Sequence, residues 1–100
     1  MEIETKEEEA RIIPEEKIDL TNSKELEESF RSLVEKDIKN ITLDFKKVRE
    51  IDSSALGKIL LFNKIMRENE GYFKIKNVNS EYVKKVFQMV DLEEVVDVEE

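Results

Sequence analysis

Apolar side chains recur along this 100-residue chain at the spacing of helices in some segments and of strands in others. Three segments have apolar positions three or four residues apart, which places them on one face of a helix. They are residues 23–35, residues 53–69 and a third helix that follows Ser80. The predicted buried faces are Leu26, Phe30, Leu33 and Val34; Ala55, Ile59, Phe62 and Met66; and Val83, Val86, Phe87 and Val90. Leu56, Leu60 and Leu61 widen the apolar surface of the second helix, so we expect it to lie deep against a sheet.

Residues that favour helix ends flank these segments. Asn22 precedes the first helix and has Glu25 three residues later, a pattern that predicts a side-chain cap. Ser80 is the expected cap of the third helix. Gly71 follows the second helix at a position where a left-handed C-terminal cap is common.

Short β-prone runs separate the helices. Ile3 and Thr5 fit an edge strand, and residues 10–13 form a second strand that Pro14 ends. Further strands are predicted at residues 41–45, at residues 72–78 and around Val95, Val96 and Val98. Because strands alternate with helices, the sequence predicts one α/β domain over residues 1–100, a mixed central β-sheet with helices packed on it.

The charge of the chain limits its partners. Charged residues make up 42% of the sequence, and the net charge is −8. Such a surface repels nucleic-acid phosphates and anionic lipid, so neither nucleic acid nor a membrane is an expected partner. The chain has no run of about 18 apolar residues and no basic, apolar leader, which favours a cytoplasmic location.

Residue types that are missing from the sequence exclude much of enzyme chemistry. The chain has no cysteine and no histidine. Thiolate catalysis, zinc–cysteine sites and Ser-His-Asp chemistry are therefore excluded. With only two glycines, the sequence contains neither of the usual glycine-rich nucleotide-binding loops. We expect a protein that is not an enzyme and has no cofactor and no bound metal.

The segment Asp52-Ser53-Ser54-Ala55-Leu56-Gly57 combines a carboxylate and two hydroxyls at a predicted helix start. Helix N-termini have unpaired N–H groups and a partial positive charge, so they accommodate a phosphate group. The segment is therefore a candidate phosphorylation site. The alternative is that Asp52 and the serines form only a helix cap, for which these residue types are also favoured.

Three sequence blocks favour the first interpretation. The run from Ile41 to Gly57, ITLDFKKVREIDSSALG, resembles the central block of the STAS family. Residues 80–92 resemble the family's third helix and the turn after it, and residues 18–21 resemble its earlier loop. The similarity spans Ile18 to Val98 and, within the family, is greatest to small bacterial anti-sigma factor antagonists.

This resemblance implies a partner-switching mechanism. The unmodified antagonist binds an anti-sigma factor that is also a serine kinase, which releases the sigma factor; phosphorylation ends the interaction and a serine phosphatase restores it. The phosphorylated residue of such proteins corresponds to Ser53, with Ser54 as the neighbouring hydroxyl. Asp52 and the loop acid Asp19 would orient the hydroxyl and contact the kinase. The implied partner-binding residues are Asp19, Thr21, Asp52, Ser53, Ser54, Ala55 and Gly57.

The chain departs from the family pattern at two places near this segment. Ala55 stands where glycine is common, and Glu16-Lys17 replaces the usual Gly-Glu before the loop acid. These differences add a methyl group and reverse a charge, so the cognate kinase would differ from the usual one. The chain ends at Glu100, about where many relatives begin a final helix.

Parts of the sequence also fit other functions. The same fold could serve as a non-phosphorylated scaffold or accessory subunit of a transporter or a stress-signalling complex. Asp19, Asp44 and Asp52 could form a carboxylate cluster for Mg²⁺ in a small enzyme. Asp44 also ends its strand as the phosphoacceptor of a receiver domain does, but the acidic pocket and partner lysine of a receiver are missing from suitable positions.

Overall fold

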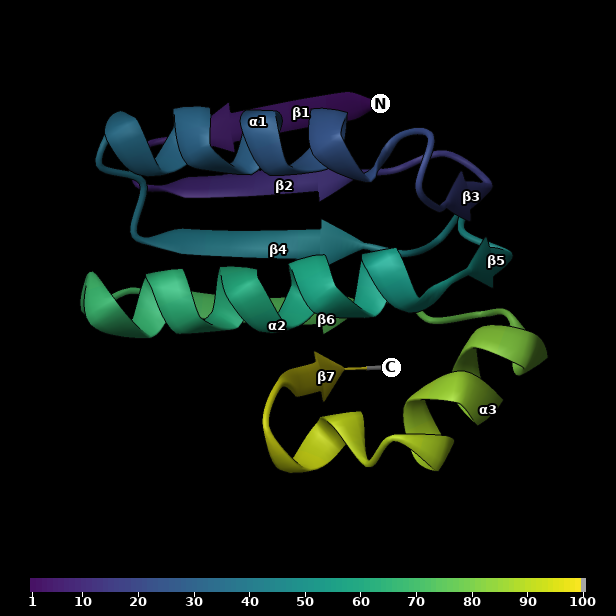
Figure 1. Cartoon of the computed structure of the whole chain (residues 1–100). Coiled ribbons are helices and arrows are strands. Elements are labelled where there is room, and N and C mark those ends of the chain that lie inside the picture. The colour runs from purple at the N-terminus through teal and green to yellow at the C-terminus, as the bar shows by residue number, and fades with distance from the viewer. Residues whose placement is uncertain (100) are drawn as a thin grey trace.

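The chain forms a five-stranded mixed sheet, seen face-on in Figure 1. The computed structural model describes residues 1–99. The order across the sheet is β1-β2-β4-β6-β7; β1 is antiparallel to β2, and the other neighbours are parallel. The strands are β1 (Glu2–Lys6), β2 (Glu9–Ile13), β4 (Asn40–Asp44), β6 (Tyr72–Lys76) and β7 (Asp97–Glu99). The predicted edge strand, mixed sheet and alternating α/β order are confirmed.

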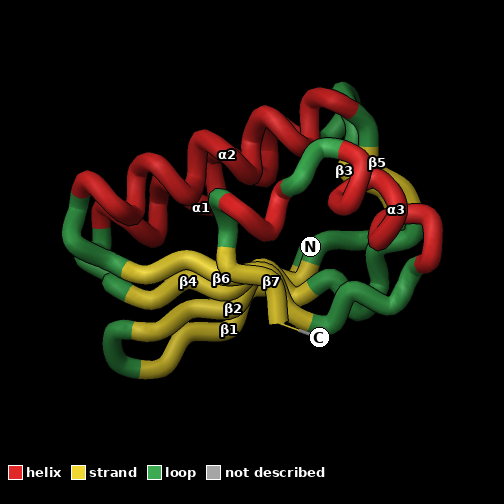
Figure 2. Tube along the Cα trace, turned by 90° about the horizontal axis from the view of Figure 1, so that it is seen from below, coloured by secondary structure: helices red, strands yellow, loops and turns green. Residues whose placement is uncertain are grey.

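Two helices cover one face of this sheet. α1 (Ser23–Glu35) and α2 (Ser53–Glu68) lie side by side above it, and no helix within residues 1–99 covers the opposite face (Figure 2). α3 (Glu81–Met89) and the short 3₁₀ helix η1 (Leu92–Glu94) connect β6 to β7. The helical periodicity therefore predicted the bounds of α1, and those of α2 to within one residue.

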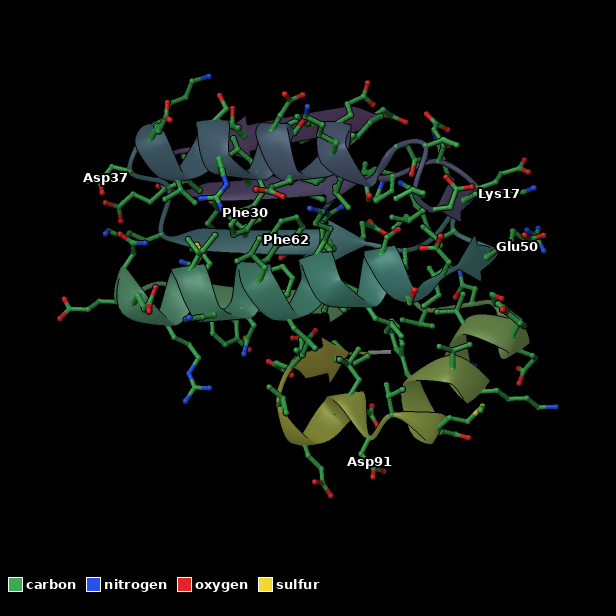
Figure 3. The ribbon with its side chains drawn as sticks, in the orientation of Figure 1. Lys17, Phe30, Asp37, Glu50, Phe62 and Asp91 are labelled. Carbon is green, nitrogen blue, oxygen red and sulfur yellow. The ribbon has the colours of Figure 1, made fainter. Side chains whose placement is uncertain are left out.

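The core lies between the two helices and the sheet. The Phe30 ring of α1 stacks on the Phe62 ring of α2 with centroids 4.1 Å apart (Figure 3). Phe73 of β6 meets both rings edge-on at 6.1 Å. Such aromatic pairs add to the stabilisation that comes from burying their area. This packing fixes α2, and with it the segment that starts the helix.

A second, two-stranded sheet stands beyond the end of the large one. β3 (Lys17–Ile18) pairs in parallel with β5 (Glu50–Ile51), next to the carboxyl ends of β2 and β4 (Figure 1). Each strand has two residues, too few to show alternation, so the sequence did not predict them. They are nevertheless the elements that bring the Asp19 loop to α2.

Two predicted helix ends differ from the structure. Asn22 precedes α1, but its side chain does not cap the helix; its Oδ1 accepts from the Asp19 amide and its Nδ2 donates to the Lys17 carbonyl. At the end of α2, Glu70 has the left-handed conformation with φ 58°, and Gly71 does not. Gly71 instead lets its backbone approach Lys39, since a Cβ there would lie 2.7 Å from the Lys39 carbonyl oxygen.

Some apolar residues that were expected inside lie at the surface. Leu60 of α2 is 45% exposed, so the wide apolar surface predicted for this helix is only partly buried. Val90, expected on the buried face of α3, is half exposed and follows the last helical residue. Val95 and Val96 precede the last strand, because η1 and a turn occupy this segment.

Candidate functional site

The β3–β5 pair holds two distant segments together. The Asp52 amide donates to the Ile18 carbonyl at 3.2 Å, which continues the parallel pairing to the first residue before α2. Lys17 and Glu50 form an ion pair across the two strands at 3.8 Å, and Figure 3 shows them at the same end of the molecule. The loop that follows β3 is therefore placed beside the start of α2.

Asp52 caps α2 as a β-region residue, with φ −122° and ψ −172°. Its Oδ1 accepts from the amides of Ser54 at 2.9 Å and Ala55 at 3.2 Å. These are two of the N–H groups that have no partner within a helix. The cap predicted from the sequence is thus present.

The two serines have different environments. The Ser54 hydroxyl is half-buried and donates to Asp52 Oδ1 at 2.5 Å. Ser53 is exposed as the first residue of α2, and its hydroxyl has no hydrogen-bond partner among the described residues. Of the two hydroxyls, that of Ser53 is the one free to react with another molecule.

The loop after β3 is connected to the cap through its backbone. The Leu20 amide donates to Asp52 Oδ2 at 3.2 Å. Asp19 accepts from both the Thr21 amide, at 2.9 Å, and the Thr21 hydroxyl, at 2.5 Å. The structure therefore brings Asp19 and Thr21 to the same end of α2 as Asp52 and Ser53.

Both carboxylates of the site are stabilised in the charged form. The pKa of Asp52 is lowered mainly by the hydrogen bond from the Ser54 hydroxyl, with further contributions from backbone amides. The pKa of Asp19 is lowered mainly by the Thr21 hydroxyl and amide, against a smaller opposing effect of the Asp52 charge. Two anionic groups thus lie beside the exposed Ser53 at neutral pH.

The remaining predicted site residues lie along α2. Ala55 is fully buried, so its side chain belongs to the core and not to the exposed surface. Gly57 is exposed, and a Cβ added there would meet nothing within 4 Å. Among the predicted contact residues, Ala55 is the one that is buried.

Asp44 does not join the other two acids. It is 1% exposed, and its Oδ1 accepts from the Lys46 amide and from Asn77 Nδ2, both at 3.0 Å. Arg11 Nη1 lies 3.7 Å from its Oδ2, which has no hydrogen-bond partner among the described residues. No group of three or more acidic side chains suited to a metal occurs in residues 1–99, so the proposed carboxylate cluster was wrong.

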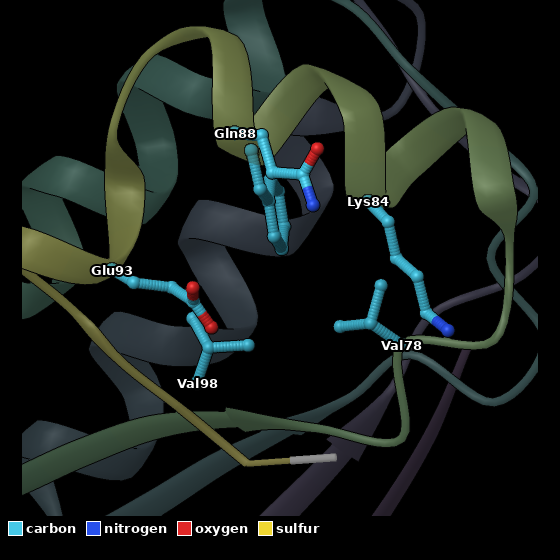
Figure 4. Close-up of a pocket in the computed structure, with 6 residues that line it drawn as sticks. Val78, Lys84, Gln88, Glu93 and Val98 are labelled. Carbon is cyan, nitrogen blue, oxygen red and sulfur yellow. The ribbon is translucent and has the colours of Figure 1, made fainter.

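The pocket shown in Figure 4 lies away from the predicted site residues at the start of α2. Figure 4 shows a small pocket between α3, the segment after it and the last strand, with Lys84, Gln88, Glu93 and Val98 at its walls. None of the predicted site residues lines it. No helix in residues 1–99 has both the length and the apolar character needed to cross a bilayer. Most of the predicted site residues thus lie on an exposed surface.

Comparisons with known proteins identify the family of this chain. The family model of the STAS domain matches residues 1–100. The chain belongs to the STAS domain family. A comparison with curated protein sequences finds no match.

Solved structures of the STAS fold are similar along most of the chain. A candidate anti-sigma factor antagonist of Thermotoga maritima superposes with a TM-score of 0.91 at 21% identity, covering 99% of this chain and 85% of that one. Unphosphorylated SpoIIAA, an anti-sigma factor antagonist, gives 0.73 at 20% identity over 88% of this chain and 81% of its own. SpoIIAA of Bacillus in its phosphorylated form gives 0.76 at 19% identity over 97% and 88%. At these identities the likeness establishes the fold.

Two exposed apolar residues near the site were not predicted from the sequence. Leu20 is 79% exposed in the loop that contacts Asp52, and Leu60 lies further along α2. For Leu60 the signal was present, because residues 53, 57 and 60 follow the spacing of one helix face. For Leu20 there was none, since a single leucine in a loop has no periodicity.

Proposed function

We propose that this STAS domain is an anti-sigma factor antagonist, itself non-catalytic, that is switched by phosphorylation of Ser53. The observation that supports this most is the state of the two hydroxyls. The Ser54 hydroxyl donates a hydrogen bond to Asp52. The Ser53 hydroxyl is exposed and has no hydrogen-bond partner among the described residues. A kinase could reach Ser53 without unfolding α2.

The start of α2 suits both forms of Ser53. A phosphoserine has about −1.5 to −2 charge at neutral pH, and the positive end of a helix stabilises it. The negative charges of Asp52 and Asp19, which lie at the same end of α2, would repel the phosphate. We therefore expect the phosphate to stay exposed and the fold to remain unchanged.

Release of the partner follows from desolvation. In its unmodified form the protein presents the neutral Ser53 hydroxyl at the end of α2 where Asp52 and Asp19 also lie. The proposed partner, an anti-sigma factor serine kinase, would bury that hydroxyl. Burying a dianion in its place costs several kcal/mol. Since each 1.4 kcal/mol is tenfold in affinity, this is enough to separate the two proteins.

The other elements of the proposal come from the family resemblance. Asp19, Thr21, Asp52, Ser54 and Gly57 would belong to the kinase contact. A serine phosphatase would remove the phosphate and restore binding. Binding of the unmodified protein would free a sigma factor, so we expect the protein to act in the cytoplasm. That SpoIIAA has been solved in both phosphorylated and unphosphorylated forms supports this proposal.

Phosphate transfer tests the proposal directly. The protein is incubated with Mg-ATP and each purified anti-sigma serine kinase encoded in its source genome, and the modified residue is mapped by mass spectrometry. We expect one phosphate, on Ser53, that is lost in Ser53→Ala and kept in Ser54→Ala. No phosphate with any of these kinases would refute the switch. Stable, ATP-independent binding to another complex would then favour the scaffold function.

A further inference from the structure

The exposed face of α2 continues well beyond Ser53. Ser53, Gly57, Leu60 and Lys64 follow at intervals of four, three and four residues, which places them in one line along the helix. All four are exposed. We call this line the α2 strip; it runs from the phosphoacceptor towards the C-terminal half of the helix.

Gly57 has no structural reason to be glycine. It lies inside α2, where glycine is less favourable than alanine, and an added Cβ would meet nothing within 4 Å. Its φ is not positive. A residue that weakens the helix without relieving any contact in the chain indicates close approach by another molecule.

Beyond Gly57 the strip borders a shallow apolar groove. Its two apolar walls are Leu60, 45% exposed, and Val95, 53% exposed. Asn63 is buried, and its Nδ2 donates to the Val95 carbonyl at 3.1 Å, which fixes the second wall against α2. This hydrogen bond fixes the position of one wall of the groove.

Charge changes sign along the strip. Asp19 and Asp52 lie at the Ser53 end, whereas Lys64 and Arg67 line the groove at the other end, with Glu68 beside them. Neither Lys64 nor Arg67 forms an ion pair within residues 1–99. These two cations lie three residues apart on α2, in a chain whose net charge is −8. A partner that fits this face has basic groups at one end and acidic groups at the other.

We propose that a segment of the anti-sigma kinase lies along the α2 strip, places an apolar side chain between Leu60 and Val95, and pairs acidic groups with Lys64 and Arg67. This rests on the proposed function and extends its contact surface. The strip provides binding energy away from the phosphoacceptor. Partner choice and the phosphate switch then depend on different residues of the same helix.

Another exposed apolar set, on and beside α3, provides a matched control. Tyr82, Met89 and Val90 are 55%, 82% and 50% exposed. Unlike the α2 strip, this set includes no glycine, and no groove in the described residues connects it to Ser53. Met89 is more exposed than Leu60, so an acidic residue there tests for a nonspecific effect of charge.

The experiment measures affinity by calorimetry with the kinase that binds the wild-type protein, in a non-hydrolysable ATP analogue so that Ser53 stays unmodified. We expect Leu60→Asp to raise Kd by about tenfold or more, as truncation of a central interface residue does. Met89→Asp should stay within about twofold of wild type. Lys64→Glu should also weaken binding, whereas Lys85→Glu, at an exposed lysine of α3, should not.

Each result has a separate meaning. Wild-type affinity in both Leu60→Asp and Lys64→Glu would overturn the α2 strip and leave the proposed function standing. Failure of the wild-type protein to bind any anti-sigma kinase would overturn the proposed function and the strip together. Urea unfolding of all four variants identifies any that are destabilised, and Lys64→Glu tests the strip by itself if Leu60→Asp fails to fold.

Discussion

Replacing Gly57 by alanine should make the protein more stable and its partner complex weaker. Alanine is favoured over glycine in a helix interior by about 0.8–1 kcal/mol. Because an added Cβ at this position meets nothing within 4 Å, no steric term opposes this gain. The free energy of unfolding should therefore rise by about 0.8–1 kcal/mol. In a domain of this size, that corresponds to a Tm about 3–8 °C higher.

Urea and thermal unfolding measure the first effect, and calorimetry with the kinase measures the second. The methyl group would stand between α2 and a partner that approaches the helix backbone, so we expect affinity to fall by about tenfold. A stabilised Gly57→Ala variant with wild-type affinity would show that no partner approaches this point. A variant that is less stable than wild type would refute the reasoning about the exposed helix itself.

Three further changes test the local structure. Gly71→Ala should lower the free energy of unfolding by about 1–3 kcal/mol, because the new Cβ would lie 2.7 Å from the Lys39 carbonyl oxygen. Urea denaturation measures this change. Glu70→Gly should raise it by about 0.5–1 kcal/mol, since Glu70 has a φ of 58° that glycine adopts without strain; an unchanged or lower urea midpoint would contradict this. Asp52→Asn tests pH dependence. The pKa of Asp52 is lowered in the fold, so its charged form stabilises the protein above about pH 4, and this contribution is lost as the pH falls through the folded pKa. Urea unfolding at several pH values measures the difference in stability between wild type and Asp52→Asn. We expect this difference to become smaller below about pH 4. A difference that does not change with pH would show that the hydrogen bond from Ser54 to the Asp52 carboxylate does not cause it.

The main elements could be predicted because periodicity is a property of many residues at once. α1 begins and ends where its apolar spacing does, at Ser23 and Glu35. The strand predicted at residues 72–78 alternates with Phe73 and Ile75 on the buried face, as expected. A pattern of this length still predicts its element when one position does not fit.

Two predictions that rested on a single residue at a helix end were wrong, because other contacts of that residue competed with the expected one. The Asn22 side chain had the right type for a cap, but the Asp19 amide and the Lys17 carbonyl use it instead. Gly71 was expected to take the left-handed conformation after α2, but Glu70, one residue earlier, takes it instead. The Asn22 contacts are with the backbone of β3 and of the loop before α1, and Gly71 lies against the backbone of Lys39. The residue types that favour helix ends do not reveal such contacts.

The sequence predicted the helix start at the candidate site but not the geometry around it. The Asp-Ser-Ser motif correctly indicated a helix start with Asp52 as its cap. Which hydroxyl is bound by Asp52 depends on side-chain rotamers, and the structure assigns that role to Ser54. The link from Leu20 to Asp52 depends on the two-residue strands β3 and β5, for which the sequence had no detectable period.

The central claim is that the charge state of Ser53 determines whether a partner binds. The most direct measurement compares the kinase affinity of the unmodified protein with that of protein prepared with phosphoserine at position 53. We predict that the phosphorylated form binds at least about a hundredfold more weakly, as expected for a penalty of about 3 kcal/mol or more, while its circular dichroism spectrum stays unchanged. Equal affinity of the two forms would contradict the account.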